Sequence, residues 1–381
     1  MGGDFSRLRF QPDRHFAAVL LQQGRVLLDS DWNEAESIRE HRQRMLIRDL
    51  LGTAAFVGDG FALSARGEKV TIGAGHAWID GLLCELATDT DSVAQPGLPS
   101  ARLPTEPGTY VAYLEVWQRE VTATEDETLR EPALGGPDTT VRLATVAQVR
   151  YHRVPGHARR SRADWSVPTE ATDATLAVHG RYEGVENRLY RVEIHEGGAQ
   201  PTFKWSRDNG STVAALRSWT ATELRLRSAQ PLFAPGDRLE VIDRARILDR
   251  RPGPFIGVDQ VDGDRLVVSS DGEPIPERLV DPVVRRWDAR PAPLREGRAN
   301  ERSELGDGLE ISVEGSRFRS GDYWLIAART ADRSVTWPDA TEADDPRPPH
   351  GIEVQRSGLA ALRRDRVGWT VLRDLRRLLR G

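Results

Sequence analysis

The sequence predicts a mainly β protein with two β-sandwich or barrel-like domains, an N-terminal helical segment and a short C-terminal helix. Short runs rich in β-branched and aromatic residues recur along most of the chain. Turn sequences such as Asp80-Gly81 and Asn209-Gly210 separate these runs at intervals of about 8 to 12 residues, which is typical of sandwiches and barrels. Helical periodicity is found only near the two ends of the chain.

The first 52 residues are expected to form an extended arm followed by one helix. Residues 4–19 are rich in aromatic side chains, which predicts an arm that packs against other parts of the protein or a neighbouring subunit. Asp31 and Glu34 have the spacing of a capping box, in which one side chain accepts amides of the first turn and the other reaches back. The helix is therefore predicted from Trp32 to about Leu51, where Gly52 ends it.

The predicted helix has one apolar face that charged residues interrupt. The interruptions are Arg42 and Asp49, and they suit a contact surface better than a dry core, because a charged side chain is costly to bury. The spacing of apolar residues changes from a helical to a strand period at Gly52, which predicts a module boundary there. A fragment of residues 53–381 is therefore expected to fold alone. The apolar face consists of Trp32, Ala35, Ile38, Met45, Leu46 and Leu50.

A calcium-binding loop is a second interpretation of the same stretch. Asp29, Asp31, Asn33 and Glu40 occupy positions 1, 3, 5 and 12 of such a loop. Position 6 requires glycine, and this chain has Glu34 there. Capping of a helix explains the stretch better than ion binding does.

Residues 53–153 are expected to form the first β domain. Asp80-Gly81 is a two-residue hairpin signal, because such turns need positive φ. The long acidic stretch 118–138 is interpreted as a projecting solvated loop or a surface that meets a partner. The strands are predicted at residues 70–72, 77–79, 110–117 and 141–151.

Residues 154–180 are polar and irregular, which predicts a connecting segment before a second β region at residues 181–350. The alternation of apolar and polar residues there predicts strands with one face buried. Hairpin chemistry recurs within residues 258–268 at Asp262-Gly263. The other strands are predicted at residues 189–195, 203–206, 212–216, 223–226, 238–242, 309–313 and 323–328.

Residues 351–381 are expected to contain an amphipathic helix. Its apolar stripe must be buried against another surface, whereas its basic face has two interpretations. Cations near a helix C-terminus are favourable by themselves, and the alternative is contact with nucleic acid or a membrane. The stripe consists of Val371, Leu372, Leu375, Leu378 and Leu379, and the basic face of Arg373, Arg376, Arg377 and Arg380.

Composition excludes several classes of protein. The formal charge is −5, and the basic residues, nearly all arginine, are interleaved with acids, which argues against nucleic-acid binding. No run approaches about 18 apolar residues and the N-terminus lacks a secretory signal, so no transmembrane segment is expected. Cys84 is the single cysteine, which excludes an internal disulfide framework and a multi-cysteine zinc site.

No recognised catalytic, cofactor-binding or metal-binding motif occurs. The sequence has no nucleophile elbow, phosphate-binding loop or dinucleotide fingerprint. His152 and His157 flank a Pro-Gly turn, but no third metal ligand accompanies them at a recognised spacing. A glycosidase carboxylate pair is a distance rather than a motif, so that possibility stays open. The expectation is a protein that is not an enzyme and has no cofactor and no metal.

Residues 203–211 admit two interpretations. Lys204 and Asp208 flank Trp205 as in a sugar-binding platform, but the same residues also describe a strand that ends in an Asn209-Gly210 turn. Trp117 and Trp205 each occur in a strand-like run, so both are predicted to lie in the β core. Ten tryptophans and many acids favour a carbohydrate-binding or glycan-hydrolysing protein as the alternative function.

Many of these segments resemble a family of bacterial proteins of unassigned biochemical activity, encoded with phage-tail-like particles and extracellular contractile injection systems. The resemblance extends from residue 3 to about residue 351. Residues 25–34 are also similar to the N-terminal docking segment of phage tail-fibre and baseplate proteins. The segments that carry the resemblance are residues 3–7, 22–26, 31–34, 116–123, 134–139, 186–195, 204–211 and 321–326.

The resemblance implies a non-enzymatic structural component of a tail-like particle: a baseplate protein, a fibre adaptor or a cap-associated protein that docks through its N-terminal segment. Some relatives carry a further β-helical C-terminal part, and this chain ends at Gly381, which favours an adaptor over a receptor-binding fibre. No catalytic residues come with the family. The expected docking residues are Phe5, Phe10, Arg25, Trp32, Ile38, Arg42, Met45 and Asp49.

The resemblance also implies partners and a location. The expected partners are tail, baseplate, sheath or cap proteins of the particle, and a homo-oligomer, a trimer or a ring, is expected within the assembly. Fibre-like parts favour three-fold symmetry. Assembly is expected in the cytoplasm, with release of the particle on lysis. For the alternative function, the protein would be tail-associated and would bind or hydrolyse a glycan.

Overall fold

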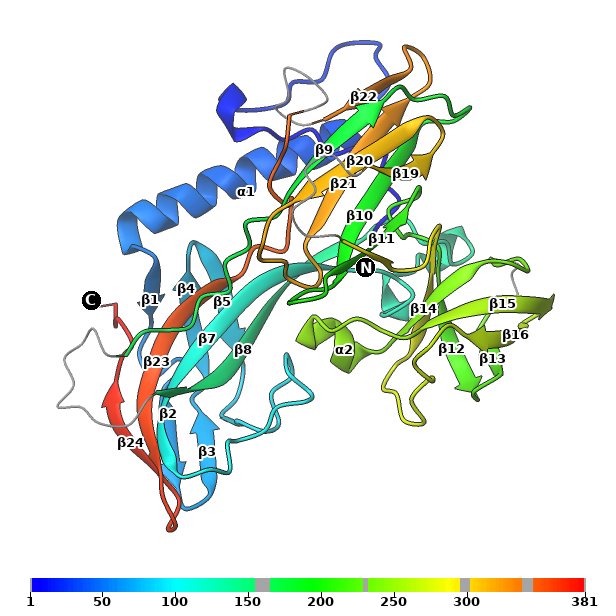
Figure 1. Cartoon of the computed structure of the whole chain (residues 1–381). Helices are drawn as coiled ribbons and strands as arrows, with labels where there is room; N and C mark the ends of the chain where they lie inside the picture. Colours follow the sequence, from blue (N-terminus) through cyan, green and yellow to red (C-terminus); the bar gives the residue numbers. More distant parts are fainter. Residues whose placement is uncertain (1, 155–164, 229–231, 295–301, 338–344, 380–381) are drawn as a thin grey trace. The chain divides into compact units, whose positions relative to one another are not determined.

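We describe the protein from a computed structural model (Figure 1). The secondary structure is mainly β, with one long helix near the N-terminus, which confirms the predicted fold class. The structure describes residues 2–154, 165–228, 232–294, 302–337 and 345–379.

The residues group into two compact units, and each unit is built from three separate segments of the chain. Strands that are distant in sequence therefore pair within each unit. The first unit comprises Met1–Glu36, Glu120–Leu143 and Ala171–Ile352, and the second comprises Ser37–Arg119, Ala144–Glu170 and Glu353–Gly381.

The second unit is built from a four-stranded sheet and two three-stranded sheets around one apolar core. The four-stranded sheet has the order β24 (Trp369–Asp374), β23 (Gln355–Arg364), β7 (Gly108–Val121) and β8 (Arg142–Val154). Buried and exposed residues alternate little along its strand β7, because both faces of the strand are covered along most of its length. The smaller sheets are β1 (Ala54–Phe56), β4 (Gly75–Ile79) and β5 (Leu82–Leu86), and β2 (Leu63–Arg66), β3 (Lys69–Ile72) and β6 (Thr90–Asp91).

The hairpin between β4 and β5 follows the predicted turn chemistry. Asp80 has φ 50° and Gly81 has φ 80°, which is the left-handed conformation that both central residues of a type I′ turn require. A side chain at Gly81 would also collide with the backbone of Arg44. The aspartate–glycine sequence therefore fixes both the turn and its close approach to the helix.

Helix α1 (Asp29–Leu51) begins three residues before the predicted start. The backbone amides of Asp31 and Trp32 both donate to the carbonyl of Leu28, so Leu28 rather than Asp31 precedes the helix. The Asp31 side chain accepts the amide of Leu28 at 3.3 Å, which makes Asp31 the residue that reaches back. At the other end Gly52, with φ 77°, donates to Arg48 and ends the helix as predicted.

The first unit contains a sandwich of two sheets that share one core. Trp324 and Tyr190 from the larger sheet and Ile311 from the smaller sheet are fully buried in that core. Figure 1 shows the two layers. The larger sheet has the order β18 (Ala292–Pro293), β11 (Thr202–Ser206), β10 (Arg188–Glu196), β21 (Tyr323–Arg329) and β22 (Ser334–Thr336), and the smaller has β19 (Ser303–Gly306), β20 (Leu309–Glu314) and β9 (Thr175–Gly180).

Strand β9 corrects part of the predicted connecting segment, because its residues pair along their whole length with β20. Residues 155–164 of that segment lie outside the described residues, as does His157 of the histidine pair considered above.

The same unit contains a closed six-stranded barrel with its own core of aliphatic side chains. A short helix, α2 (Arg244–Asp249), follows one of its strands, and Asp243 caps that helix by accepting the amide of Arg246. The barrel order is β12 (Val213–Trp219), β13 (Glu223–Leu226), β16 (Arg265–Ser270), β15 (Phe255–Asp262), β14 (Arg238–Ile242) and β17 (Val283–Trp287), and β12 closes on β17.

Three short 3-10 helices complete the elements of the described residues. The first lies in the N-terminal arm, and the other two lie in the acidic stretch between β7 and β8, which is therefore partly ordered by local turns. They are η1 (Pro12–Arg14), η2 (Glu127–Leu129) and η3 (Pro132–Leu134).

The predicted C-terminal amphipathic helix is wrong. Residues 355–364 and 369–374 form β23 and β24, and β23 pairs with β7 as well as with β24. Gly368 turns the chain with φ 141°, and Trp369 packs beside Tyr110 with ring centroids 5.4 Å apart. Four successive residues of β23, from Leu359 to Leu362, are buried. A strand buried on both faces does not alternate between apolar and polar residues, so its hydrophobic pattern cannot be distinguished from that of a buried helix. Arg380 lies outside the described residues.

Trp117 and Trp205 are both buried, as predicted. Replacing either by alanine should lower the free energy of unfolding by about 3 to 5 kcal/mol, because a large cavity replaces the indole ring. Urea denaturation followed by circular dichroism measures this change.

Trp32 is the matched control, since its side chain is 61% exposed. Trp32→Ala should leave the free energy of unfolding within about 0.5 kcal/mol of the original. Equal losses at all three positions would contradict the assignment of Trp117 and Trp205 to the core.

Candidate functional site

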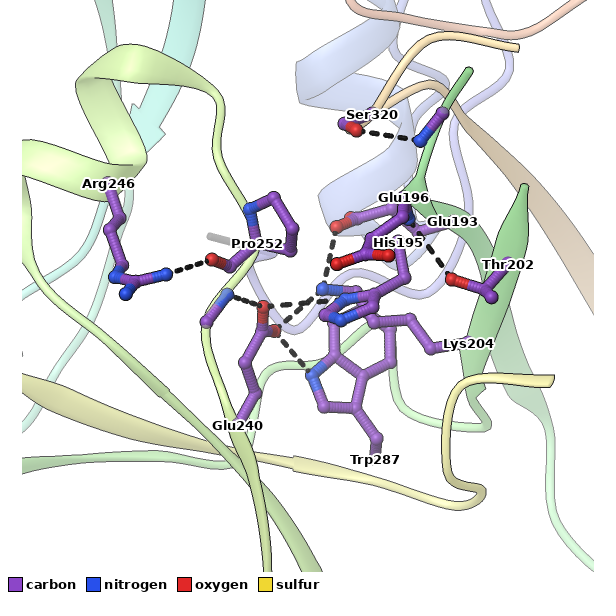
Figure 2. Close-up of polar contacts among 12 residues, drawn as sticks. Glu193, His195, Glu196, Thr202, Lys204, Glu240, Arg246, Pro252, Trp287 and Ser320 are labelled. Carbon is purple, nitrogen blue, oxygen red and sulfur yellow. Dashed lines mark hydrogen bonds and ion pairs between the residues drawn. The ribbon is translucent and has the colours of Figure 1, made fainter. Parts of the chain in front are cut away.

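A cluster of buried charged residues lies where the sandwich and the barrel of the first unit meet (Figure 2). Register places Glu193 of β10 opposite Lys204 of β11, and Glu240 of β14 opposite Arg285 of β17. His195 lies at a register shift of β10 and reaches the same cluster, with its Nδ1 atom 3.9 Å from Oε1 of Glu240. All five residues are buried.

Lys204 joins the two halves of the cluster. Its Nζ atom lies 2.7 Å from Oε2 of Glu240 and 3.2 Å from Oε1 of Glu193. The side chains of Lys204 and Glu240 are 3% and 1% exposed, so water screens this ion pair very little. A buried ion pair is stable only if the remaining hydrogen-bonding capacity is satisfied.

Glu240 meets that condition. The indole Nε1 of Trp287 donates to Oε2 at 2.9 Å, and the backbone amide of Gly253 donates to Oε1 at 3.0 Å. The ammonium group of Lys204 also lies 4.5 Å from the centre of the Trp287 ring and 6.0 Å from that of Phe255. Two carboxylates and two aromatic rings therefore surround a single amine.

The electrostatics keep both carboxyl groups ionised. Burial alone raises the pKa of Glu193 and of Glu240. The Lys204 charge opposes burial at both residues, with Arg191 assisting at Glu193, and the pKa of each ends below its ordinary value. Arg285 carries its charge in the same cluster, where burial lowers its pKa.

His195 is the neutral member of the cluster. Burial first and the Lys204 charge second lower its pKa to about 4, although Glu240 and Glu193 act in the opposite direction. Its Nδ1 atom, 3.9 Å from Oε1 of Glu240, has no hydrogen-bond partner in the part of the chain that the structure describes. The ring meets Phe255 edge to face.

A chain of hydrogen bonds connects this cluster to the N-terminal arm. Glu193 accepts from Nε of Arg191 at 2.7 Å, and Nη1 of Arg191 lies 3.5 Å from the side-chain oxygen of Asn209. The amide of Asn209 donates to the carbonyl of Gly3 at 2.8 Å, and the Gly3 amide donates to Glu120 at 2.8 Å. The start of the chain is thus part of the buried polar network.

Further contacts hold Phe5, Ser6 and Arg9 of the arm. Phe5 packs against a small apolar cluster on the larger sheet, and Ser6 donates two hydrogen bonds to Asp29. Arg9 pairs with Asp31 at 2.8 Å and with Glu34 at 3.3 Å. These contacts argue against the expectation that residues 53–381 fold alone, because their removal would leave Asn209 buried without its partner.

The structure places the predicted docking residues in different environments. Phe5 and Phe10 are half-buried. Ile38 is 2% exposed and is therefore corrected: its side chain belongs to the interior of this chain and is not available to a partner. The remaining five are exposed, and they are Arg25, Trp32, Arg42, Met45 and Asp49.

Apolar exposure is concentrated near the N-terminus. Among the described residues, eleven of the twenty-two exposed large apolar side chains lie between Leu8 and Leu50. Leu20 is 85% exposed and Val26 is 83% exposed, although both are aliphatic. The ten from residue 16 onward are named here the N-terminal apolar residues: Phe16, Leu20, Leu21, Val26, Leu27, Leu28, Trp32, Met45, Leu46 and Leu50.

Residues 203–211 form a strand and a turn, as one of their two interpretations predicted. Asn209 and Gly210 have φ values of 58° and 60°, and Trp205 is 9% exposed. Trp205 is therefore not a sugar-binding platform. Lys204 stands out in the sequence, but its partners Glu193 and Glu240 do not, because strand register rather than sequence spacing brings the three together.

The described residues contain no group of three or more histidine, cysteine or acidic side chains able to hold a metal ion. Cys84 is buried, and burial raises the pKa of its thiol to about 12. Among the described residues, no helix is long and apolar enough to cross a membrane. The chemistry that the cluster does offer is that of a primary amine held against two carboxylates.

Comparison with protein-family models found a match to a family of unknown function (DUF6519), which covers residues 1–166 and 160–361. Comparison with curated proteins and with solved structures found no match. The two matched segments together cover all of the first compact unit, most of the second and the buried cluster.

His195 should make stability fall in mildly acidic solution. The unfolded chain binds a proton as the pH falls through about 6.5, whereas the folded chain stays unprotonated until about 4. The folded state should therefore lose on the order of 3 kcal/mol across that window. Urea denaturation at pH 7, 6, 5 and 4 measures the loss. His195→Gln should reduce it and leave the part that His350 contributes, because burial also lowers the pKa of His350 to about 4.

His76 is exposed and serves as the matched control, so His76→Gln should keep the original slope. Parallel stability curves for the original protein and His195→Gln would contradict the neutral, buried state of His195. Loss of the Glu193 and Glu240 contributions is expected only at lower pH, because lowered carboxyl pKa values act below about 4.3.

Proposed function

The chain belongs to the family of unknown function DUF6519, and we propose that it is a non-enzymatic structural component of a phage-tail-like contractile injection system. In this proposal it acts as a baseplate protein, fibre adaptor or cap-associated protein and docks through its N-terminal segment. The observation that carries the proposal is the exposure of the N-terminal apolar residues. Monomeric soluble proteins seldom expose so many large apolar side chains in one stretch, and such exposure typically marks an interaction site.

The exposed residues of helix α1 support a contact along its length. Trp32 and Leu50 are eighteen residues apart, which is five full turns, and Leu46 lies about 40° from them around the axis. These three side chains therefore share one side of the helix. The buried Glu34 lies about 160° from Trp32 around the axis, whereas the buried Ile38 lies about 80° from Leu46 and borders this side. An amphipathic helix with one apolar side exposed is suited to bind a groove or another helix.

The anchored arm gives the segment a fixed starting point. Residues 2–9 are held by Glu120, Asn209 and the apolar cluster under Phe5, and helix α1 begins at Asp29. The stretch between these anchors carries six of the N-terminal apolar residues. A segment fixed at both ends loses less conformational entropy on binding than a free tail does.

The proposal includes partners and an oligomeric state. The partners are tail, baseplate, sheath or cap proteins of the particle, assembled in the cytoplasm and released with it on lysis. Parts of such particles repeat around an axis, so a homo-oligomer, a trimer or a ring, is part of the proposal. The exposed charged residues Arg25, Arg42 and Asp49 would then set the orientation of the contact rather than its strength.

The test is incorporation into the particle. The complete gene cluster is expressed, particles are isolated by sedimentation, and the protein is quantified in them by mass spectrometry. The original chain should be incorporated, and a variant with Leu21→Ser, Trp32→Ser, Leu46→Ser and Leu50→Ser should be depleted at least about tenfold, because it loses apolar burial at four positions. Its melting temperature should be nearly unchanged, because all four side chains are exposed.

A matched control changes exposed apolar residues elsewhere. Val185 is 92% exposed and Val367 is 87% exposed, so Val185→Ser and Val367→Ser remove apolar surface without touching the N-terminal segment. This double variant should be incorporated normally. Normal incorporation of the four-site variant, or absence of the original chain from the particles, would refute the proposal.

A further inference from the structure

Lys204 is unusual in a chain that uses arginine for nearly every basic position. The sequence has 53 basic residues, and only Lys69 and Lys204 are lysines. Lys69 lies at the surface beside Asp91. Arginine is the usual cation of buried ion pairs, since its guanidinium is planar and more weakly hydrated. A lysine in the buried position supplies what arginine lacks, a primary amine that becomes a nucleophile when it loses a proton.

The amine is held at reaction distance from a carboxyl group. Nζ of Lys204 and Oε2 of Glu240 are 2.7 Å apart, and both side chains are at least 97% buried. Holding two reacting groups in contact replaces a bimolecular encounter and corresponds to an effective concentration of up to about 10⁵ to 10⁸ M. Trp287 and Phe255 border the amine, so little water competes with it.

The carboxyl group of Glu240 is also polarised. The Trp287 indole donates to one oxygen at 2.9 Å, and the Gly253 amide donates to the other at 3.0 Å. Two fixed donors of this kind stabilise negative charge on the oxygens as a tetrahedral intermediate develops. Glu193, 3.2 Å from the same amine, is a second carboxylate that can accept and return a proton.

From this arrangement we propose that Lys204 and Glu240 condense into an intramolecular isopeptide bond, with Glu193 as the catalytic proton carrier (Figure 2). The bond would join β11 of the sandwich to β14 of the barrel covalently. This inference does not depend on the proposed function, because it concerns a buried pair and not the exposed N-terminal apolar residues.

The step balances without any further reactant. Glu193 takes a proton from the Lys204 ammonium, and the freed nitrogen lone pair attacks Cδ of Glu240. The bond between Nζ and Cδ forms, and the bond between Cδ and Oε2 breaks. Two protons that began on Nζ leave with Oε2 as water, one of them carried by Glu193. An ammonium and a carboxylate thus become an amide and one water molecule.

The resting state is the ion pair, and its proton transfer is uphill. Each carboxyl group prefers its charged form beside Lys204, so condensation is slow. One turnover per molecule is sufficient, however, because the amide is sequestered from water once it has formed.

Mass spectrometry of the purified full-length protein tests the bond. Its intact mass, measured after denaturation, should be lower than the sequence mass by one water molecule. Trypsin should release a branched peptide in which residues 192–207 are joined to residues 239–244, with no cleavage after Lys204. Fragmentation of that peptide should place the link between Lys204 and Glu240. This mapping is needed because dehydration at an aspartate–glycine sequence, such as Asp262-Gly263, gives the same mass change.

Three variants complete the test. Lys69→Arg, the matched control, should still show the branched peptide, whereas Lys204→Arg should lack it. Glu193→Gln, sampled over time after synthesis, should form the bond roughly a hundredfold more slowly. If Lys204→Arg does not fold, the mapped peptide of the original protein shows whether the bond exists, and the rate for Glu193→Gln shows whether Glu193 carries the proton.

An original protein with the full sequence mass and no branched peptide would overturn the inference, because the pair would then be an ion pair only. A link from Lys204 to Glu193 instead of Glu240 would overturn the assignment of the acceptor. An unchanged rate in Glu193→Gln would overturn its role as proton carrier.

Discussion

The charge balance around Lys204 constrains how the strands of the first unit are arranged. A lysine and two glutamates are buried together, and removal of one partner from such a cluster leaves an uncompensated charge that costs about 3 to 5 kcal/mol. Because the three residues come from β10, β11 and β14, the larger sheet and the barrel must keep their registers for the charges to meet. The cluster therefore specifies this arrangement of strands within the unit, whether the pair stays ionic or condenses.

The same network reaches the surface through the arm. Arg191 and Asn209 extend it from Glu193 to the backbone of Gly3, and a side chain at Gly2 would collide with the carbonyl of Asn209. The two glycines allow the chain to enter this narrow space. With its first residues fixed in the interior, the chain emerges with its apolar residues exposed, and this is the physical link between the buried cluster and the proposed docking segment.

Local signals in the sequence predicted much of the fold. Asp80-Gly81 and Asn209-Gly210 form the expected turns, because positive φ is a requirement of the turn itself. The prediction of a C-terminal helix was wrong. Leu359–Leu362 is buried on both faces, and its pairing with the distant strand β7 leaves no signal in the local sequence. The start of α1 was misplaced, because Asp31 binds Arg9 and reaches back to Leu28. The cluster was unpredictable from spacing, since Lys204 and Glu240 meet only through folding.

The most direct measurement of the central claim, docking through the N-terminal segment, is amide hydrogen exchange on the intact protein, free and within isolated particles. Residues 16–28, which lie outside regular secondary structure, should exchange rapidly in the free chain and become protected in the particle. Helix α1 should gain protection at the same time, while the barrel strands stay unchanged. Equal exchange of residues 16–28 in both states, with new protection elsewhere, would contradict the account.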